Sequence, residues 1–259
     1  MFKIERQREI IDLLKENKSM LVTQMAKTLY IGEATIRRDL DNLEKQGLIK
    51  RTYGGAVWLE GLDSEIPLHV RESHNKLQKD SIGKAAAKLI TDGDVVIMDS
   101  SSTTYSMVKY LSHISKLTVI TNGAKTAVSL GKFVDFDVYS TGGRLRKNSL
   151  SYSGDVTKSF ISDVHANILF FSCRSFSAER GLFDASVEEA ELRRIMIKNS
   201  DKKVLLCDSS KFSADSFYKV CGIDVLDYVI TDADFPDEDL KLLEERGVAC
   251  IKCNDAHQI

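Results

Sequence analysis

The segment from Ala34 to Ala56 constrains the fold more than any other, because it combines a helical pattern with a glycine-tipped hairpin. Ile36, Leu40 and Leu43 recur at the spacing of one helix face, which predicts a helix that buries these three side chains. Gly47 is typical of a helix stop. We therefore expect a helix that ends here and is followed by short strands.

The residues after this helix predict a wing. Leu48–Arg51 followed by Tyr53–Trp58 has the pattern of two short strands with a turn, and Gly54-Gly55 lies at this turn. The exposed face of the helix carries Arg38, with Arg37 on its flank. Adjacent arginines on a helix beside a basic hairpin are typical of a winged helix-turn-helix, which places such a helix in a groove of DNA.

Two further helices are expected before this one. Residues 6–15 carry apolar side chains at helical spacing, so they predict a first helix. Thr23 is predicted to cap a second helix, and residues 30–32 make the turn into the third. The order helix, turn, helix, wing therefore predicts a DNA-binding domain over residues 1–58.

The charge distribution agrees with this prediction. Residues 1–58 contain 11 Lys and Arg against 8 Asp and Glu, whereas the remainder contains 25 against 30. In an alternative interpretation, Arg37 pairs with Asp41 on a solvated helix and the glycines serve only a turn. The residues that we expect to face DNA are Thr23, Ala34, Thr35, Arg37, Arg38, Lys45, Lys50, Arg51, Tyr53 and Gly54.

The rest of the chain predicts a linker and a second domain. Residues 59–73 hold Pro67 and few periodic apolar residues, which predicts a linker. Residues 74–259 begin with a helical pattern and then alternate apolar runs with helical segments, which is typical of an α/β domain with a mostly parallel sheet. The strand candidates are residues 95–98, 117–120, 136–139, 168–171, 204–207 and 228–230.

Polar residues follow four of these strand candidates. Because ligands bind beyond the carboxyl ends of parallel strands, we expect these residues to meet in one site. Hydroxyls, backbone amides and cations in one place suit a phosphorylated small molecule, although each stretch alone is also typical of a capped helix or turn. The candidate ligand-binding residues are Asp99, Ser100, Ser101, Ser102, Thr103, Thr104, Thr121, Asn122, Gly142, Gly143, Arg144, Asp208 and Lys211.

The segments "IRRDLDNLEKQGLIKRTYGGA", "DSSSTT", "GGRLR" and "DSSKF" resemble those of the DeoR family of bacterial transcription regulators. The resemblance covers nearly the whole chain. It implies a sensor domain whose fold is similar to that of sugar-phosphate isomerases, and it implies binding of a phosphorylated sugar. It also implies repression as the usual mode of action.

The chain departs from the family pattern at four places. Gly32-Glu33 replaces a small polar residue at the start of the third helix, which removes a side-chain cap. Ser101 replaces a glycine, and residues 171–176 (FSCRSF) replace a small, glycine-containing loop, so we expect a reshaped or narrowed pocket. Arg193 stands where the family often has lysine, which keeps the charge but changes its shape.

Three functions are compatible with the sequence. The first is a homo-oligomeric transcriptional regulator that binds operator DNA and a phosphorylated sugar effector and needs no cofactor. The second is a sugar-phosphate isomerase or deaminase with an accessory DNA-binding module; Asp99, Glu188, Glu189 and Asp208 are its candidate bases. The third is a DNA-binding protein whose second domain only oligomerises.

The remaining features predict a cytoplasmic protein without a metal site. No run approaches the ~20 apolar residues of a membrane span, and the N-terminus is too charged for a signal peptide. The five cysteines are an odd number scattered over a long chain, which favours reduced thiols. Cys250 and Cys253 have C-x-x-C spacing, but no second pair completes a zinc site.

Overall fold

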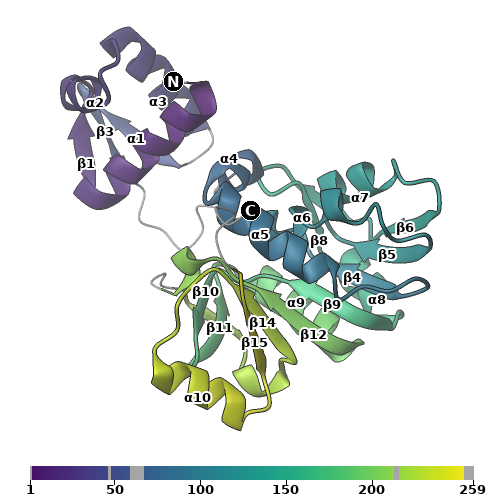
Figure 1. The fold of residues 1–259 in the computed structure, drawn as a ribbon. Coiled ribbons are helices and arrows are strands. Elements are labelled where there is room, and N and C mark those ends of the chain that lie inside the picture. The colour runs from purple at the N-terminus through teal and green to yellow at the C-terminus, as the bar shows by residue number, and fades with distance from the viewer. Residues whose placement is uncertain (1, 46–47, 59–66, 213–215, 254–259) are drawn as a thin grey trace. The chain divides into compact units, whose positions relative to one another are not determined.

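The computed structural model describes residues 2–45, 48–58, 67–212 and 216–253, and the chain divides into two compact units, residues 1–74 and 75–259 (Figure 1). The described elements of the first unit are α1 (Lys3–Asn17), β1 (Ser19–Leu21), α2 (Val22–Leu29), α3 (Glu33–Lys45), β2 (Ile49–Thr52), β3 (Gly55–Trp58) and α4 (Leu68–Ser73). Its strands pair antiparallel in the order β1-β3-β2. The predicted winged helix-turn-helix is confirmed.

The core of the first unit follows the sequence pattern. Ile36, Leu40 and Leu43 on α3 are fully buried, and they pack with Ile10 and Leu14 from α1. Burying one such side chain contributes about 1.5–3 kcal/mol, so this apolar stripe fixes which face of α3 points outward.

The two glycines of the wing have different roles. Gly54 has φ +81° in the turn between β2 and β3, a conformation that favours glycine. A Cβ on Gly55 would lie 2.4 Å from the Met20 carbonyl oxygen, so this residue lets β3 approach β1 closely. The first glycine shapes the tip of the wing and the second attaches the wing to the unit.

Two expectations about the first unit are corrected. Thr23 does not cap α2, because the helix begins at Val22 and the Leu21 backbone N donates to Gln24 Oε1 at 3.0 Å instead. Part of the predicted linker is helical: α4 packs on α1, with Val70 buried in the same core. Residues 59–66 of that linker lie outside the described residues.

The second unit is an α/β domain. Its described helices are α5 (Lys76–Ala87), α6 (Ser102–Tyr105), η1 (Val108–Tyr110), α7 (Ala124–Leu130), α8 (Asp155–Ser162), α9 (Val187–Lys198), η2 (Ser209–Lys211), η3 (Ile223–Val225) and α10 (Asp237–Glu245). Its described strands are β4 (Val95–Met98), β5 (Leu117–Thr121), β6 (Phe136–Ser140), β7 (Arg144–Arg146), β8 (Ser151–Ser153), β9 (Ala166–Phe171), β10 (Ser175–Ser177), β11 (Gly181–Asp184), β12 (Ser200–Leu206), β13 (Tyr218–Cys221), β14 (Tyr228–Thr231) and β15 (Ala249–Lys252).

Seven of these strands form one parallel sheet in the order β15-β14-β12-β9-β4-β5-β6. Successive side chains of a strand point to opposite faces, and both faces are buried. Ile168 and Phe170 therefore join the core beneath α5 and α7, whereas Leu169 and Phe171 join the core beneath α8 and α9. All six predicted strands lie in this sheet.

The second unit also contains two smaller antiparallel sheets. The β7–β8 hairpin and the sheet β10-β11-β13 are antiparallel, and neither was predicted. All five cysteines are free thiols, and burial raises the pKa of Cys221 to about 12. No helix in the described part of the chain is long and apolar enough to cross a membrane.

Candidate nucleic-acid interface and ligand site

The outer face of α3 and the tip of the wing present the predicted DNA-contacting side chains. Ala34, Arg38, Lys50 and Tyr53 are exposed. Among the described residues, no hydrogen bond or ion pair engages the guanidinium of Arg38. Thr23 is exposed in the first turn of α2, while Lys45 ends α3 and its side chain lies outside the described part.

Two predicted DNA contacts are held by carboxylates. Arg37 Nη2 donates to Glu33 Oε2 at 2.8 Å, one turn earlier on α3. Arg51 forms an ion pair with Asp41, and its Nη1 also donates to the Arg37 carbonyl at 3.3 Å. Arg51 therefore links β2 to α3, and the pairing of Arg37 with Asp41 in the alternative interpretation is not formed.

A buried ion pair fixes the orientation of α3. Asp39 is 1 % exposed and pairs with Arg6 of α1, whose Nη2 donates to Asp39 Oδ1 at 3.3 Å. The hydrogen bond that Arg6 donates to the Asp39 carboxylate raises the pKa of Arg6, although burial acts in the opposite direction. Sequence reasoning missed this pair, although Asp39 lies three residues after Ile36 and so falls on the buried face.

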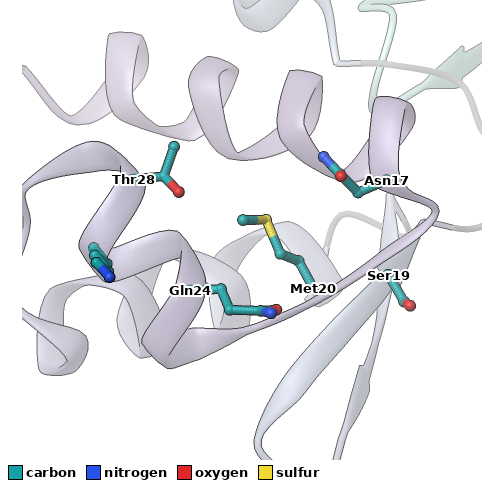
Figure 2. Close-up of a pocket in the computed structure, with 6 residues that line it drawn as sticks. Asn17, Ser19, Met20, Gln24 and Thr28 are labelled. Carbon is teal, nitrogen blue, oxygen red and sulfur yellow. The ribbon is translucent and has the colours of Figure 1, made fainter.

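A hollow of about 370 Å³ lies beside α2 (Figure 2). Its lining residues are Asn17, Ser19, Met20, Gln24, Lys27 and Thr28. Asn17 Nδ2 donates to the Leu13 carbonyl at 2.9 Å, and Gln24 Oε1 accepts from the Leu21 backbone. Because these groups already serve the local backbone, we place the ligand site in the second unit.

The ends of β4 and β9 form the point where the sheet reverses its strand order. From β4 the chain adds β5 and β6 on one side, and then returns to add β9, β12, β14 and β15 on the other. Ligands of open α/β sheets bind at such a reversal. Asp99 follows β4 and Ser172 follows β9, so these two residues mark the expected position.

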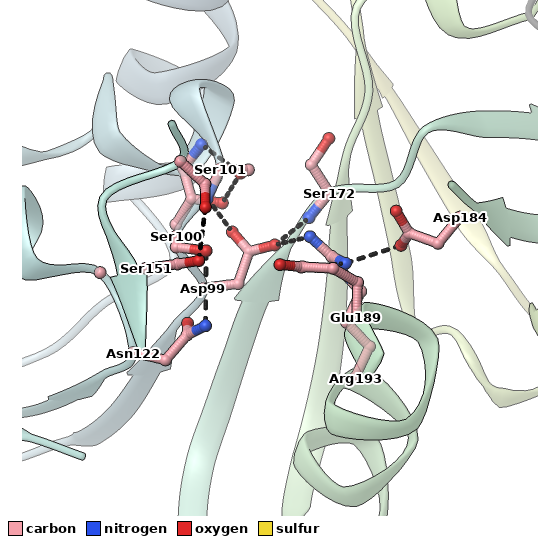
Figure 3. Close-up of polar contacts among 12 residues, drawn as sticks. Asp99, Ser100, Ser101, Asn122, Ser151, Ser172, Asp184, Glu189 and Arg193 are labelled. Atoms are coloured by element: carbon pink, nitrogen blue, oxygen red, sulfur yellow. Dashed lines mark hydrogen bonds and ion pairs between the residues drawn. The ribbon is translucent and has the colours of Figure 1, made fainter. Parts of the chain in front are cut away.

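Asp99 joins the two strand ends (Figure 3). Its Oδ1 accepts from the Ser101 backbone N at 3.0 Å, and its Oδ2 accepts from the Ser172 backbone N at 3.1 Å. Arg193 Nη2 donates to the same Oδ2 at 3.1 Å. Asp99 thus holds together the two strand ends at which a ligand would bind.

Arg193 forms ion pairs with three carboxylates. Besides Asp99, its Nη1 contacts Asp184 Oδ2 at 2.6 Å and Glu189 Oε2 at 2.9 Å. Burial opposes the charge of Arg193, but these carboxylates outweigh it and raise the pKa. Burial also raises the pKa of Asp184 to about 6, against the effect of Arg193. A planar guanidinium is well suited to such shared contacts.

Three buried polar atoms at the ends of sheet strands have no hydrogen-bond partner among the described residues. Among the described residues, Asn122 Oδ1, Ser172 Oγ and Asp208 Oδ2 are buried and accept or donate no hydrogen bond. They follow β5, β9 and β12, so they lie at one edge of the sheet. Asn122 Nδ2 reaches Ser100 Oγ at 3.4 Å, which links this group to the end of β4.

A second charged group lies at the end of β12. Asp208 is fully buried, and Asn75 Nδ2 donates to its Oδ1 at 2.9 Å. Burial raises the pKa of Asp208, but the charges of Lys211 and Lys79 act against burial, and the resulting pKa lies below the ordinary value. Lys79 was not predicted; it lies three residues before the buried Ile82, on the inner face of α5.

The remaining predicted ligand-binding residues are distributed as follows. Ser100 to Thr104 and Thr121 are buried, but Thr121 Oγ1 accepts from the Gly123 backbone at 3.0 Å and Ser101 Oγ caps α6. Arg144 is exposed and pairs with Glu188 Oε2 at 3.0 Å. Thr157 Oγ1 donates to the Gly142 carbonyl at 2.7 Å, and Gly143 is exposed.

Both units match family models. Residues 6–61 match the DeoR-like helix-turn-helix domain, and residues 74–233 match the DeoR C-terminal sensor domain. Together, these two matches account for most of the chain.

Similar proteins span nearly the same length. The HTH-type transcriptional regulator YulB of Bacillus subtilis is 36 % identical over 96 % of each chain. The HTH-type transcriptional repressor GlcR of the same organism is 33 % identical, covering 96 % of this chain and 95 % of GlcR. The L-fucose operon activator of Escherichia coli is 29 % identical, covering 89 % and 95 %. These relatives are named as transcriptional regulators rather than enzymes.

Solved structures resemble parts of the chain. Ribose 5-phosphate isomerase A of Methanocaldococcus jannaschii matches 54 % of this chain and 55 % of its own, with a TM-score of 0.39 and 16 % identity. The eIF2B delta protein of Chaetomium thermophilum matches 63 % and 58 %, with a TM-score of 0.42 and 18 % identity. From the two family models and the full-length relatives, the chain belongs to the DeoR family and is a DNA-binding transcriptional regulator.

Proposed function

We propose that this regulator represses genes of sugar metabolism and that a phosphorylated sugar modulates its binding to operator DNA. The observation that carries the proposal is the set of unpaired buried atoms on Asn122, Ser172 and Asp208. A buried polar group without a partner costs about 1–3 kcal/mol, so a ligand that supplies the missing hydrogen bonds is favoured there.

The chemistry of these atoms suits a phosphorylated sugar. Asn122 Oδ1 and Asp208 Oδ2 are acceptors, and the hydroxyls of a sugar are donors. Lys211, beside Asp208, supplies the positive charge that a phosphate requires. Arg144, which we expected in this role, is held by Glu188 at the surface.

The names of the relatives support a role in sugar metabolism. They include both activators and repressors of transcription. One relative is named an L-fucose operon activator and another a transcriptional repressor. We favour repression, because several relatives are named transcriptional repressors. A homo-oligomer follows from DNA geometry, because one winged helix covers only a short half-site.

The test is a fluorescence anisotropy titration with labelled promoter DNA from the gene's own upstream region and with random DNA of equal length, both at physiological salt. We expect a clear preference for the promoter DNA and a change of its Kd when a phosphorylated sugar is added. Equal binding of both DNAs would contradict operator recognition. Specific DNA binding that no phosphorylated sugar alters would favour a second domain that only oligomerises.

A further inference from the structure

Arg174 lies between β9 and β10, next to the proposed ligand site. Its backbone N donates to the Phe183 carbonyl at 3.0 Å, and Ser175 pairs with Phe183 in the β10–β11 ladder. Continuing this register by one residue places Arg174 opposite Asp184. Opposite residues of an antiparallel pair project from the same face, so Arg174 projects on the side where Asp184 contacts Arg193.

The guanidinium of Arg174 has unused donors. In the part of the chain that the structure describes, no hydrogen bond or ion pair engages this side chain. The residue is half-buried, and burial lowers its pKa while the charge of Asp184 acts in the opposite direction. Arginine nevertheless keeps its charge in proteins. A half-buried cation with free donors therefore lies beside the ligand site.

The carboxylate of Asp184, whose charge acts on Arg174, does not use these donors. Asp184 Oδ2 is bound by Arg193 at 2.6 Å, and Asp184 Oδ1 accepts from the Ala185 backbone N at 3.3 Å. Asp99 and Glu189 are likewise bound to Arg193, and Glu189 is also paired with Arg146. The carboxylates of this group thus have partners of their own, and Arg174 remains available to a ligand.

The site therefore offers cations at two neighbouring strand ends. Lys211 acts on Asp208 after β12, and Arg174 follows β9, which is the neighbour of β12 in the sheet. A monophosphate held by Lys211 would leave the donors of Arg174 without an anionic partner. We propose that Arg174 binds a second anionic group, so that the preferred effector is a phosphorylated sugar that carries a further carboxylate or phosphate. This inference rests on the proposed phosphosugar function.

Matched ligand pairs test the proposal by isothermal titration calorimetry on the full-length protein. Glucose 6-phosphate and 6-phosphogluconate differ in a carboxylate, and fructose 6-phosphate and fructose 1,6-bisphosphate differ in a second phosphate. We expect the more anionic member of at least one pair to bind about tenfold more tightly, the effect of ~1.4 kcal/mol from one charge-assisted contact. The pair that shows the difference distinguishes the carboxylate from the second phosphate.

Variants assign the preference to Arg174. In Arg174→Gln the preference should disappear while the Kd of the monophosphate stays within about twofold, and Arg174→Lys should retain part of it. The matched control is Arg180→Gln, because Arg180 is exposed on the same hairpin, 5.8 Å from the centre of the Phe183 ring. This variant should keep the full preference, and circular dichroism should show native spectra for all three.

The outcomes separate the two proposals. Equal Kd values within both ligand pairs, or a preference that survives in Arg174→Gln, would overturn the role of Arg174 and leave the phosphosugar site intact. If none of the four compounds and no other phosphorylated sugar binds the wild-type protein, the proposed function fails and the role of Arg174 fails with it.

Discussion

Two adjacent arginines on α3 differ in what they are free to do. Arg37 is paired with Glu33, whereas Arg38 is exposed and, among the described residues, no hydrogen bond or ion pair engages its guanidinium. Arg38→Ala should weaken operator binding by about 1–3 kcal/mol if this residue contacts a base edge, and should change the free energy of unfolding by less than about 0.5 kcal/mol. Anisotropy titration and urea unfolding measure the two effects.

The control for this prediction is Arg180→Ala, which removes the same charge from the surface of the other unit. It should leave operator affinity unchanged. If Arg38→Ala weakens binding to operator and random DNA by the same factor, Arg38 contacts phosphate rather than bases.

Asp184 makes the stability of the second unit depend on pH. Its pKa is raised to about 6 in the folded protein, above the ordinary value of 3.8, chiefly by burial. The folded state therefore binds the proton more tightly, so this stabilisation is complete below pH 3.8 and is lost as pH rises through about 6. Relative to Asp184→Asn, wild-type protein should lose stability between pH 4 and 7, by at most on the order of 3 kcal/mol.

Unfolding monitored by circular dichroism at pH 4.5, 6 and 7.5 measures this difference. A stability difference between wild type and Asp184→Asn that is constant over the range would show that another member of the group with Arg193 takes up the proton.

Single residues show where sequence reasoning reaches its limit. Asp99, Asn122 and Asp208 could be predicted because the ends of parallel strands meet at one edge. Arg144 and Arg174 could not be distinguished by sequence, since each is an arginine near a strand end. Glu188 binds Arg144, and only the folded chain brings these residues together from 44 positions apart.

At the scale of elements, the Asp39–Arg6 pair joins α1 to α3. Asp39→Asn should destabilise the first unit by about 1–3 kcal/mol, because Arg6 would lose its charged partner in a partly buried place. Trp58, the single tryptophan of the chain, lies on β3 and reports unfolding of this unit by fluorescence. Asp41→Asn removes an exposed ion pair on the same helix and should cost less than about 1 kcal/mol. Equal losses in both variants would contradict a special role for Asp39.

The start of α3 lacks a side-chain cap. The Gly32 carbonyl accepts from the backbone N of Thr35 and Ile36 at 3.0 and 3.2 Å, and a Cβ at Gly32 would meet no atom within 4 Å. Gly32→Ser should therefore raise the free energy of unfolding of the first unit by a few tenths to about 1 kcal/mol. The Trp58 fluorescence transition measures it, and a lower midpoint would show that glycine is required here.

Elements differ in how well the sequence predicts them. The sheet strands were predicted because each is an apolar run that is buried on both faces, as Val95–Met98 and Ala166–Phe171 illustrate. The hairpin strands Arg144–Arg146 and Ser175–Ser177 have three residues each, which is too short for a period of two to stand out. Helix α4 was missed because its packing on α1, rather than its own pattern, stabilises it.

At the scale of the whole molecule, the proposed control of DNA binding must be reciprocal. If a phosphorylated sugar weakens operator binding by some factor, operator DNA must weaken binding of that sugar by the same factor. A coupling of about 5- to 150-fold corresponds to ~1–3 kcal/mol between the ligand site and the DNA-binding surface. The Kd of the sugar, measured by calorimetry with and without saturating operator, should therefore change by the factor seen in anisotropy.

The same experiment on Arg38→Ala provides the control. This variant leaves the ligand site unchanged and is expected to bind operator weakly, so the Kd of the sugar should stay at its DNA-free value when the same concentration of operator is added. A sugar that binds the wild-type protein equally well with and without operator has no preference between the two states, and a ligand without such a preference cannot shift the equilibrium. That result would show that the two units act independently. It would contradict the proposed control by an effector but not the proposed recognition of DNA.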